Sequence, residues 1–211
     1  HGIMCCVLPK NFRNCLYYDK LRNHINKNYT ILNIHDTSSE KFIDTQQDTM
    51  IFTIQNKKPK SNSKWVMEKQ GYTIFNDNVS KLQSYYEGST LLDTLGFCVK
   101  VGNVVWNQVK NKLTNDSSKT LLVYSSNIKD NKLQIQNFNN EQKKQYINID
   151  GNRGPMLIVN RGYGNGEYKF NYAVINPDQK YLCENHIICI VPKNDMDYQT
   201  LMANYEKITN S

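Results

Sequence analysis

The chain has 211 residues, of which 39% are hydrophobic and 21% charged, and its formal net charge is +7. This length fits one large domain or two small ones with a packed core. No apolar run comes near the roughly 18 residues of a membrane-spanning helix, and the six cysteines include no CxxC pair and no histidine at zinc spacing, which excludes a transmembrane segment and a zinc centre. We expect reduced thiols in a cytoplasmic protein of a bacterium or of a virus-infected host cell.

The positive charge is mostly lysine and is spread along the chain. A diffuse positive charge favours attraction to the phosphates of a nucleic acid. The many asparagines indicate an alternative, namely a codon bias that enriches Lys, Asn, Ile and Tyr together. Charge alone therefore favours a nucleic-acid partner only slightly.

Three strands and one helix are predicted in the first part of the chain. Residues 3–8 are continuously apolar and are followed by Pro9, which predicts a strand buried on both faces, as in a parallel sheet. Apolar residues at helical spacing predict an amphipathic helix over about 14–26. Apolar and β-branched runs predict two further strands, over 30–34 and 49–54.

A polar loop, residues 35–47, precedes the third of these strands and holds one aromatic residue, Phe42. Residues 57–64 read KKPKSNSK, which has the composition of a solvated linker. We therefore predict that residues 1–60 form part of an α/β sheet. Residues 61–211 should form a separate, β-rich α+β domain.

Short strands, separated by turns with Asn, Asp or Gly, dominate this predicted second domain. A hairpin over 65–75 and a helix over 79–87 come first, and a helix over 195–208 closes the chain. The predicted strands between them span 97–101, 104–106, 121–125, 133–135, 156–159, 168–174 and 186–191.

Residues 160–169 read NRGYGNGEYK and follow an apolar run. Glycine allows a backbone to approach a partner closely, Arg offers a fork of donors, and Tyr offers a flat face with a polar tip. The combination predicts an exposed loop that faces nucleic acid, although a plain glycine hairpin is the alternative. Its candidate contacts to bases or phosphates are Arg161, Tyr163, Tyr168 and Lys169. The spacing does not fit a nucleotide-binding GxxxxGK[ST] loop.

A second candidate stretch reads KVGNVVWNQVKNK. Asn and Gln can pair with adenine edges, and Lys can contact guanine or phosphate. The candidate DNA contacts in it are Lys100, Asn103, Asn107, Gln108 and Lys110. Trp106 fits a core position of its strand as well as a contact, and Gly102 is expected in a tight turn. The later triplet Glu184-Asn185-His186 is expected to be structural, with Asn185 ordering a turn, because no nucleophile accompanies it.

Several segments, in order, resemble the gamma-type adenine-N6 DNA methyltransferases. GIMCCVLPKNF, CLYYDKLRNHI, YTILNIHD and KFIDTQQDTMIFTIQN resemble the later catalytic motifs of that group, namely a strand ending in Pro, an amphipathic helix and the last two strands of the S-adenosylmethionine-dependent fold. LGFCVKVGNVVWNQ, RGYGNGEYKFNYAVI and YLCENHIICI resemble its target-recognition domain.

This resemblance implies the end of a catalytic domain followed by a domain that selects the DNA sequence. It implies S-adenosylmethionine as the cofactor of the full-length enzyme, double-stranded DNA as the partner, and a role in restriction-modification. It also implies that Phe42, in the loop before the last strand, stacks on the flipped adenine, the alternative being a core Phe that pins the loop. Pro9 and Lys10 fall where a sheet edge faces the substrate cleft, although a structural turn is the more ordinary interpretation.

Two features of the family are absent from this sequence: the glycine loop that binds S-adenosylmethionine and the Asn-Pro-Pro-aromatic motif. We therefore assign no catalytic residue and no metal site, and we expect that the chain by itself does not transfer a methyl group. An N-terminal catalytic segment or subunit is the expected partner. The alternatives are a stand-alone DNA-binding specificity module without catalytic activity, and a remnant or interaction protein with no DNA role.

Overall fold

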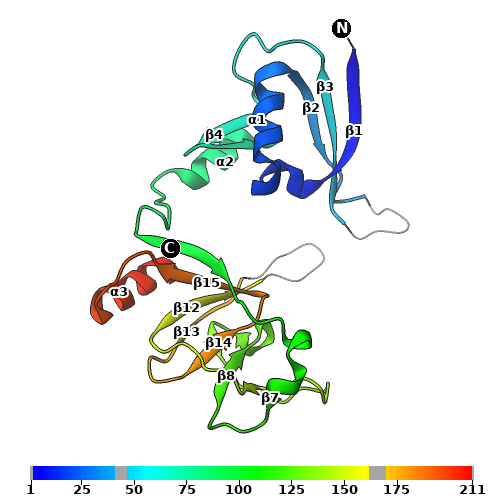
Figure 1. The fold of residues 1–211 in the computed structure, drawn as a ribbon. Helices are drawn as coiled ribbons and strands as arrows, with labels where there is room; N and C mark the ends of the chain where they lie inside the picture. Colours follow the sequence, from blue (N-terminus) through cyan, green and yellow to red (C-terminus); the bar gives the residue numbers. More distant parts are fainter. Residues whose placement is uncertain (1, 41–46, 162–169, 211) are drawn as a thin grey trace. The chain divides into compact units, whose positions relative to one another are not determined.

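A computed structural model describes residues 2–40, 47–161 and 170–210, and it divides the chain into two units, His1–Ser89 and Thr90–Ser211 (Figure 1). Each unit has its own buried apolar core. Within the described residues, no helix is both long enough and apolar enough to cross a lipid bilayer.

A three-stranded antiparallel sheet forms the centre of the first unit. Its strands are β1 (Ile3–Pro9), β2 (Thr30–Asp36) and β3 (Thr49–Gln55), in the order β1-β3-β2. Every second side chain of the central strand is buried, namely Met50, Phe52 and Ile54, because side chains of a strand alternate between its two faces. Ile25 of helix α1 (Asp19–Asn28) joins the same apolar cluster.

The helix begins later than predicted. Two short 3-10 turns, Lys10–Arg13 and Leu16–Tyr18, precede it, and Cys15 between them has an extended backbone. The first turn buries Phe12 against Phe52, with ring centroids 5.8 Å apart. The range predicted as one helix therefore covers a 3-10 turn, Leu16–Tyr18, and most of helix α1.

The boundary between the units lies later along the chain than the linker composition suggested. Residues 61–89, which we predicted with the second domain, belong to the first unit. They form β4 (Val66–Lys69), β5 (Tyr72–Phe75) and α2 (Val79–Tyr86). The Phe75 ring is fully buried and stacks on Phe52 at 5.6 Å, so this hairpin completes the first core.

Arg22 of α1 also holds this hairpin in place. The side chain is 1% exposed, and its guanidinium donates to three backbone carbonyls, those of Phe12 (3.0 Å), Cys15 (2.8 Å) and Thr73. Asp19 accepts from Arg22 (3.3 Å) and from the backbone N–H of Thr73 (2.9 Å). Burial lowers the pKa of the Arg22 guanidinium, and the Asp19 carboxylate opposes this shift.

Strand β1 differs from its prediction as a strand buried on both faces. Among the described residues it pairs only with β3 and lies at the edge of an antiparallel sheet. Its side chains of Ile3, Met4 and Val7 are 64%, 53% and 55% exposed. The predicted strand is therefore present, but the described chain covers neither the outer edge of β1 nor one face of its sheet.

The second unit contains two four-stranded sheets. The first, in the order β13-β12-β15-β6, consists of β6 (Phe97–Val101), β12 (Met156–Asn160), β13 (Tyr172–Ile175) and β15 (Ile187–Pro192). The second, in the order β14-β8-β11-β7, consists of β7 (Leu113–Thr114), β8 (Thr120–Val123), β11 (Tyr146–Ile147) and β14 (Tyr181–Cys183). A small hairpin of β9 (Ile128–Lys129) and β10 (Lys132–Leu133) lies beside them.

Strand β12 is buried from both sides. Ile158 packs toward the strands of the second sheet, with Leu121 and Val123. Leu157 packs against the closing helix α3 (Tyr198–Thr209), with Leu201 and Tyr205. The closing helix is confirmed, and Asp197 caps it by accepting a hydrogen bond from the backbone N–H of Thr200 at 2.9 Å.

Candidate nucleic-acid interface

Three sequence motifs converge at one end of the β13-β12-β15-β6 sheet. The register pairs Val101, at the end of β6, with Ile188, and Asn160, at the end of β12, with Ile187. The backbone N–H of Arg161 donates to the His186 carbonyl (3.2 Å), and that of Asn185 donates to the Val104 carbonyl (2.9 Å). The stretch after β6, the turn before β15 and the chain after β12 therefore share one rim, the recognition rim.

Three predicted DNA contacts lie at this rim or next to it. Lys100, Asn103 and Arg161 all have exposed side chains. Tyr163, Tyr168 and Lys169 lie outside the described residues, but the two ends of their segment are described. Asn160 and Asn171 bond each other at that point through the Asn160 backbone N–H (2.9 Å) and the Asn160 amide oxygen (2.7 Å).

Gly102 lets the two backbones of the recognition rim touch. A Cβ atom at this position would lie 2.2 Å from the Glu184 carbonyl oxygen and 2.4 Å from that of Cys183, distances that no side chain can occupy. The backbone N–H of Gly102 donates to the Ile187 carbonyl at 2.9 Å. Its role is therefore close approach between strands, in place of the predicted tight turn.

Glu184 is a buried carboxylate that fixes the turn before β15. Its oxygens accept from the backbone N–H of His186 (3.0 Å) and contact the ring Nδ1 of His186 (2.6 Å), and the residue is 3% exposed. The imidazole itself is about 40% exposed at the rim. The amide oxygen of Asn185 is buried without a hydrogen-bond partner among the described residues. This triplet orders the rim, as the sequence suggested.

The other predicted contacts of the same stretch lie on two 3-10 turns, Trp106–Gln108 and Lys110–Lys112. Asn107, Gln108 and Lys110 are exposed there, and the Lys110 ammonium donates to Gln142 (2.7 Å). Trp106 is half-buried and packs against a different cluster, around Leu122 and Tyr124. The sequence-predicted contacts therefore form two groups, one at the recognition rim and one over the second sheet.

Lys143 lies among the aromatic rings of this second group. Its ammonium nitrogen is 4.1 Å from the ring centroid of Tyr124, 4.6 Å from Phe138 and 5.9 Å from Trp106. Burial lowers the pKa of Lys143, and the nearby Glu184 charge opposes the shift. Burial raises the pKa of Tyr124, and Glu184 adds to the rise. Cation–π contact of this kind is stabilising, which favours a structural role for these rings.

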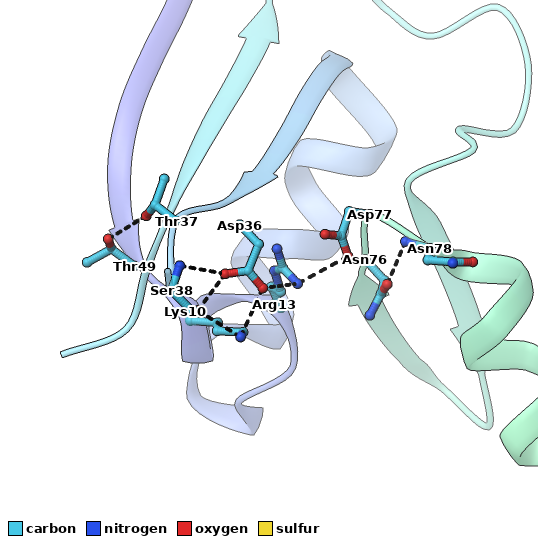
Figure 2. Close-up of polar contacts among 9 residues, drawn as sticks. All are labelled: Lys10, Arg13, Asp36, Thr37, Ser38, Thr49, Asn76, Asp77 and Asn78. Atoms are coloured by element: carbon cyan, nitrogen blue, oxygen red, sulfur yellow. Dashed lines mark hydrogen bonds and ion pairs between the residues drawn. The ribbon is translucent and has the colours of Figure 1, made fainter. Parts of the chain in front are cut away.

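A separate polar cluster lies in the first unit, where β1 and β2 end and β3 begins (Figure 2). Asp36 lies between two cations: its carboxylate is 2.9 Å from the Lys10 ammonium and 3.5 Å from the Arg13 guanidinium. Arg13 also contacts Asp77 at 3.2 Å, and Lys10 donates to the Ser38 hydroxyl at 2.8 Å. We call these residues the Asp36 cluster.

The charge of Asp36 is strongly stabilised. Partial burial by itself raises the pKa of this carboxyl group, but hydrogen bonds from Ser38 and Lys10, with the positive charge of Lys10, outweigh burial and bring the pKa to about 2. Arg13 is only 8% exposed, and two of its guanidinium nitrogens, Nε and Nη2, have no hydrogen-bond partner among the described residues. The cluster thus fixes Lys10 and the end of β2 in one arrangement.

The Asp36 cluster flanks the segment that contains Phe42, which lies outside the described residues. Thr37 and Thr49, on the two sides of that segment, share a hydroxyl–hydroxyl bond of 2.7 Å (Figure 2). Sequence reasoning singled out Lys10 but missed Asp36 and Arg13. A signal for Asp36 was available, because Asp-Thr-Ser after a strand favours an Asx turn, and the Ser38 N–H does donate to Asp36 at 2.9 Å.

Neither the recognition rim nor the Asp36 cluster contains a recognisable metal centre. Among the described residues, no three His, Cys, Asp or Glu side chains gather in a way that could hold a metal ion. The recognition rim offers guanidinium, ammonium and amide groups, which are suited to phosphates and base edges.

The chain is similar to a known viral enzyme. It is 25% identical over 194 residues to the type II methyltransferase M.CvrRI of Paramecium bursaria Chlorella virus XZ-6E, and the aligned part makes up 90% of this chain and 49% of that protein. The chain therefore spans about half the length of the curated relative that it matches. No family model matches the chain. The similarity relates this chain to a type II methyltransferase over nearly its whole length.

Proposed function

We propose that this chain is part of a site-specific, adenine-N6 DNA methyltransferase of a restriction-modification system, and that its second unit selects the DNA sequence. The observation that carries the proposal is the recognition rim, at or next to which Lys100, Asn103 and Arg161 expose their side chains. Arg can bind guanine or phosphate in a bidentate manner, and Asn can bind adenine. The similarity to a type II methyltransferase supports a DNA substrate.

In this proposal the first unit is the end of the catalytic domain. Its sheet ends in an open edge at β1, with exposed apolar side chains, which supports a place beside further strands of a larger sheet. The Asp36 cluster then borders the pocket of the flipped adenine, and Phe42 stacks on that base. Lys10, held by Asp36 and Ser38, faces the same border.

The methyl donor of the whole enzyme is S-adenosylmethionine in this proposal. This chain contains neither the glycine loop nor the Asn-Pro-Pro-aromatic motif of the family that it resembles, so its own residues do not make up the donor site and no step of methyl transfer is assigned to them. What they contribute is recognition of DNA and part of the base pocket.

The experiment is selection of bound duplexes from a random DNA pool, followed by sequencing, with the chain and two arginine variants. Arg161→Ala removes the rim guanidinium. Arg153→Ala is the matched control, because this exposed arginine precedes β12 at the strand's opposite end. We expect enrichment of one short site, lost in Arg161→Ala with an affinity drop of about 10- to 100-fold, and kept in Arg153→Ala. Binding without enrichment contradicts sequence recognition by this rim.

A stand-alone specificity module is the second candidate, and the position of the whole recognition rim within the second unit favours it. The two candidates differ in whether the chain needs another segment for full DNA affinity. A module binds its site with full affinity alone, whereas part of a larger enzyme gains affinity or methylates DNA only when a segment with the missing motifs is added.

A further inference from the structure

A basic hollow lies in the first unit at the end of the sheet where β3 finishes. It has a volume of about 490 Å³ and lies between the start of β2 and the loop of residues 57–65. Four lysines line it, Lys57, Lys58, Lys60 and Lys64, and all four are exposed. No aspartate or glutamate of the described segments lines it. We call it the lysine hollow.

The loop that forms the hollow is built into the unit, in contrast to the solvated linker that its composition predicts. The Thr30 hydroxyl donates to the Lys57 carbonyl at 2.8 Å, which ties the start of the loop to β2. At its other end the backbone N–H of Val66 donates to Ser63 (3.1 Å), and that of Asn76 donates to Trp65 (2.9 Å). The loop is therefore tied to the unit at both ends, and its lysines surround a concave surface.

The described carboxylates do not neutralise the charge of the hollow. None of its four lysines forms an ion pair with a described carboxylate. The Lys64 ammonium lies 4.7 Å from the ring centroid of Trp65, which is half-buried against the core. Several like charges on one concave surface raise the local positive potential and attract polyanions. Ser61, Asn62 and Ser63 add hydrogen-bond donors that suit phosphate oxygens.

The lysine hollow is separate from the Asp36 cluster. Thr49, at the start of β3, lies next to that cluster, whereas Gln55, at the end of the same strand, lines the hollow. A strand of this length spans about 20 Å, so one phosphate group cannot contact both places. The hollow is therefore a second surface of the first unit that nucleic acid can contact, apart from any contact at the Asp36 cluster.

We propose that the lysine hollow binds the phosphodiester backbone of duplex DNA and contributes affinity independently of sequence. The choice of DNA as the polyanion rests on the proposed function, whereas the phosphate chemistry rests on the hollow alone. Each phosphate contact releases counterions and contributes about 0.9 to the slope of log affinity against log salt concentration.

The test measures binding of a fluorescent duplex by the full chain across a series of salt concentrations. The loop variant replaces Lys57, Lys58, Lys60 and Lys64 by Gln. The control variant replaces four other exposed lysines, Lys20, Lys27, Lys81 and Lys119, by Gln, so both variants lose the same net charge. We expect the loop variant to lower the salt slope by about 2 to 4, equally for every duplex sequence, and the control variant to lower it by less than about 1.

Equal slopes for the loop and control variants overturn the proposal. Failure of the proposed function has a different signature, since it removes sequence preference in the selection experiment and leaves the salt slopes unaffected. Circular dichroism and thermal melting establish whether the loop variant is folded. If it is not, the double variant of Lys58 and Lys60 takes its place, with an expected slope decrease of about 1 to 2 against Lys20 and Lys27 as controls.

Discussion

The central sheets of the two units differ in how they are covered. In the second unit, β12 is buried on both sides, by α3 and by the strands of the second sheet, and its Leu157 and Ile158 are at most 1% exposed. In the first unit, β1 has an equally apolar sequence, yet Ile3 and Val7 are more than half exposed. Apolar side chains of this density on a sheet usually meet another layer of protein. The second unit carries its own covering layers. In the first unit, β1 is as apolar as a covered strand, but no described element covers its exposed side chains.

The largest expected effect separates the two units directly. Arg22→Ala removes a buried guanidinium that bonds three carbonyls and Asp19, and the three carbonyls lose this donor. We expect the first unit to lose about 3 to 5 kcal/mol of stability, with no effect on the second. Hydrogen exchange of the backbone amides measures both units in one sample. Equal loss of protection in α1 and in α3 contradicts the division at Ser89–Thr90.

The second effect breaks the recognition rim. Gly102→Ala places a methyl group against the carbonyls of Glu184 and Cys183, so the rim must open. We expect a destabilisation of the second unit by about 1 to 3 kcal/mol, measured by urea unfolding, and weaker DNA binding. Gly2→Ala is the control, because a Cβ there meets nothing within 4 Å. Full stability in Gly102→Ala means that the two backbones do not touch as described.

The third effect concerns the Asp36 cluster and depends on pH. Because the folded-state pKa of Asp36 is lowered to about 2, its charge stabilises the fold above the unfolded-state pKa, and this stabilisation is lost as the pH falls toward 2. With solvent screening, we expect Asp36→Asn to cost about 1 kcal/mol at pH 7 and nothing near pH 2. Unfolding by urea at several pH values measures this, with Asp195→Asn as the control for loss of one carboxylate. A cost that does not change with pH contradicts an ionic role for Asp36.

Local patterns predicted the elements well and their surroundings poorly. The three strands of the first sheet, the closing helix and the longer strands of the second unit were predicted because apolar periodicity reports what each segment prefers to bury, whereas the strand predicted over 104–106 is replaced by an isolated bridge at Val104 and a 3-10 turn. The same signal cannot report whether the covering element exists, which is why β1 was expected to be buried. Composition misplaced the domain boundary, since the bonds of Arg22 to the hairpin are non-local and lysine-rich loops can still be tied to a sheet.

For the candidate site too, the sequence indicated single residues but not their arrangement in space. Residue types pointed to Lys100, Asn103 and Arg161 individually, but only strand register brings them to one rim. The close contact at Gly102 depends on β6 meeting the turn before β15, and no short sequence window contains both.

The smallest expected effect on stability compares an exposed edge strand of the first unit with one of the second. Val7 in β1 and Val99 in β6 are both on edge strands and are 55% and 56% exposed, so each mutation to Lys should change stability by no more than about 0.5 kcal/mol. Their effects on solubility should differ. Lys100 already lies between Val99 and Val101 and protects the edge of β6, whereas no charged residue occurs between Ile3 and Pro9 in β1. We therefore expect Val7→Lys to raise the solubility limit of the chain clearly more than Val99→Lys, as measured by precipitation at increasing protein concentration. An equal gain from the two variants means that β1 is no more open to association than an ordinary edge strand, and it removes the main support for a further layer or strand beside the first sheet.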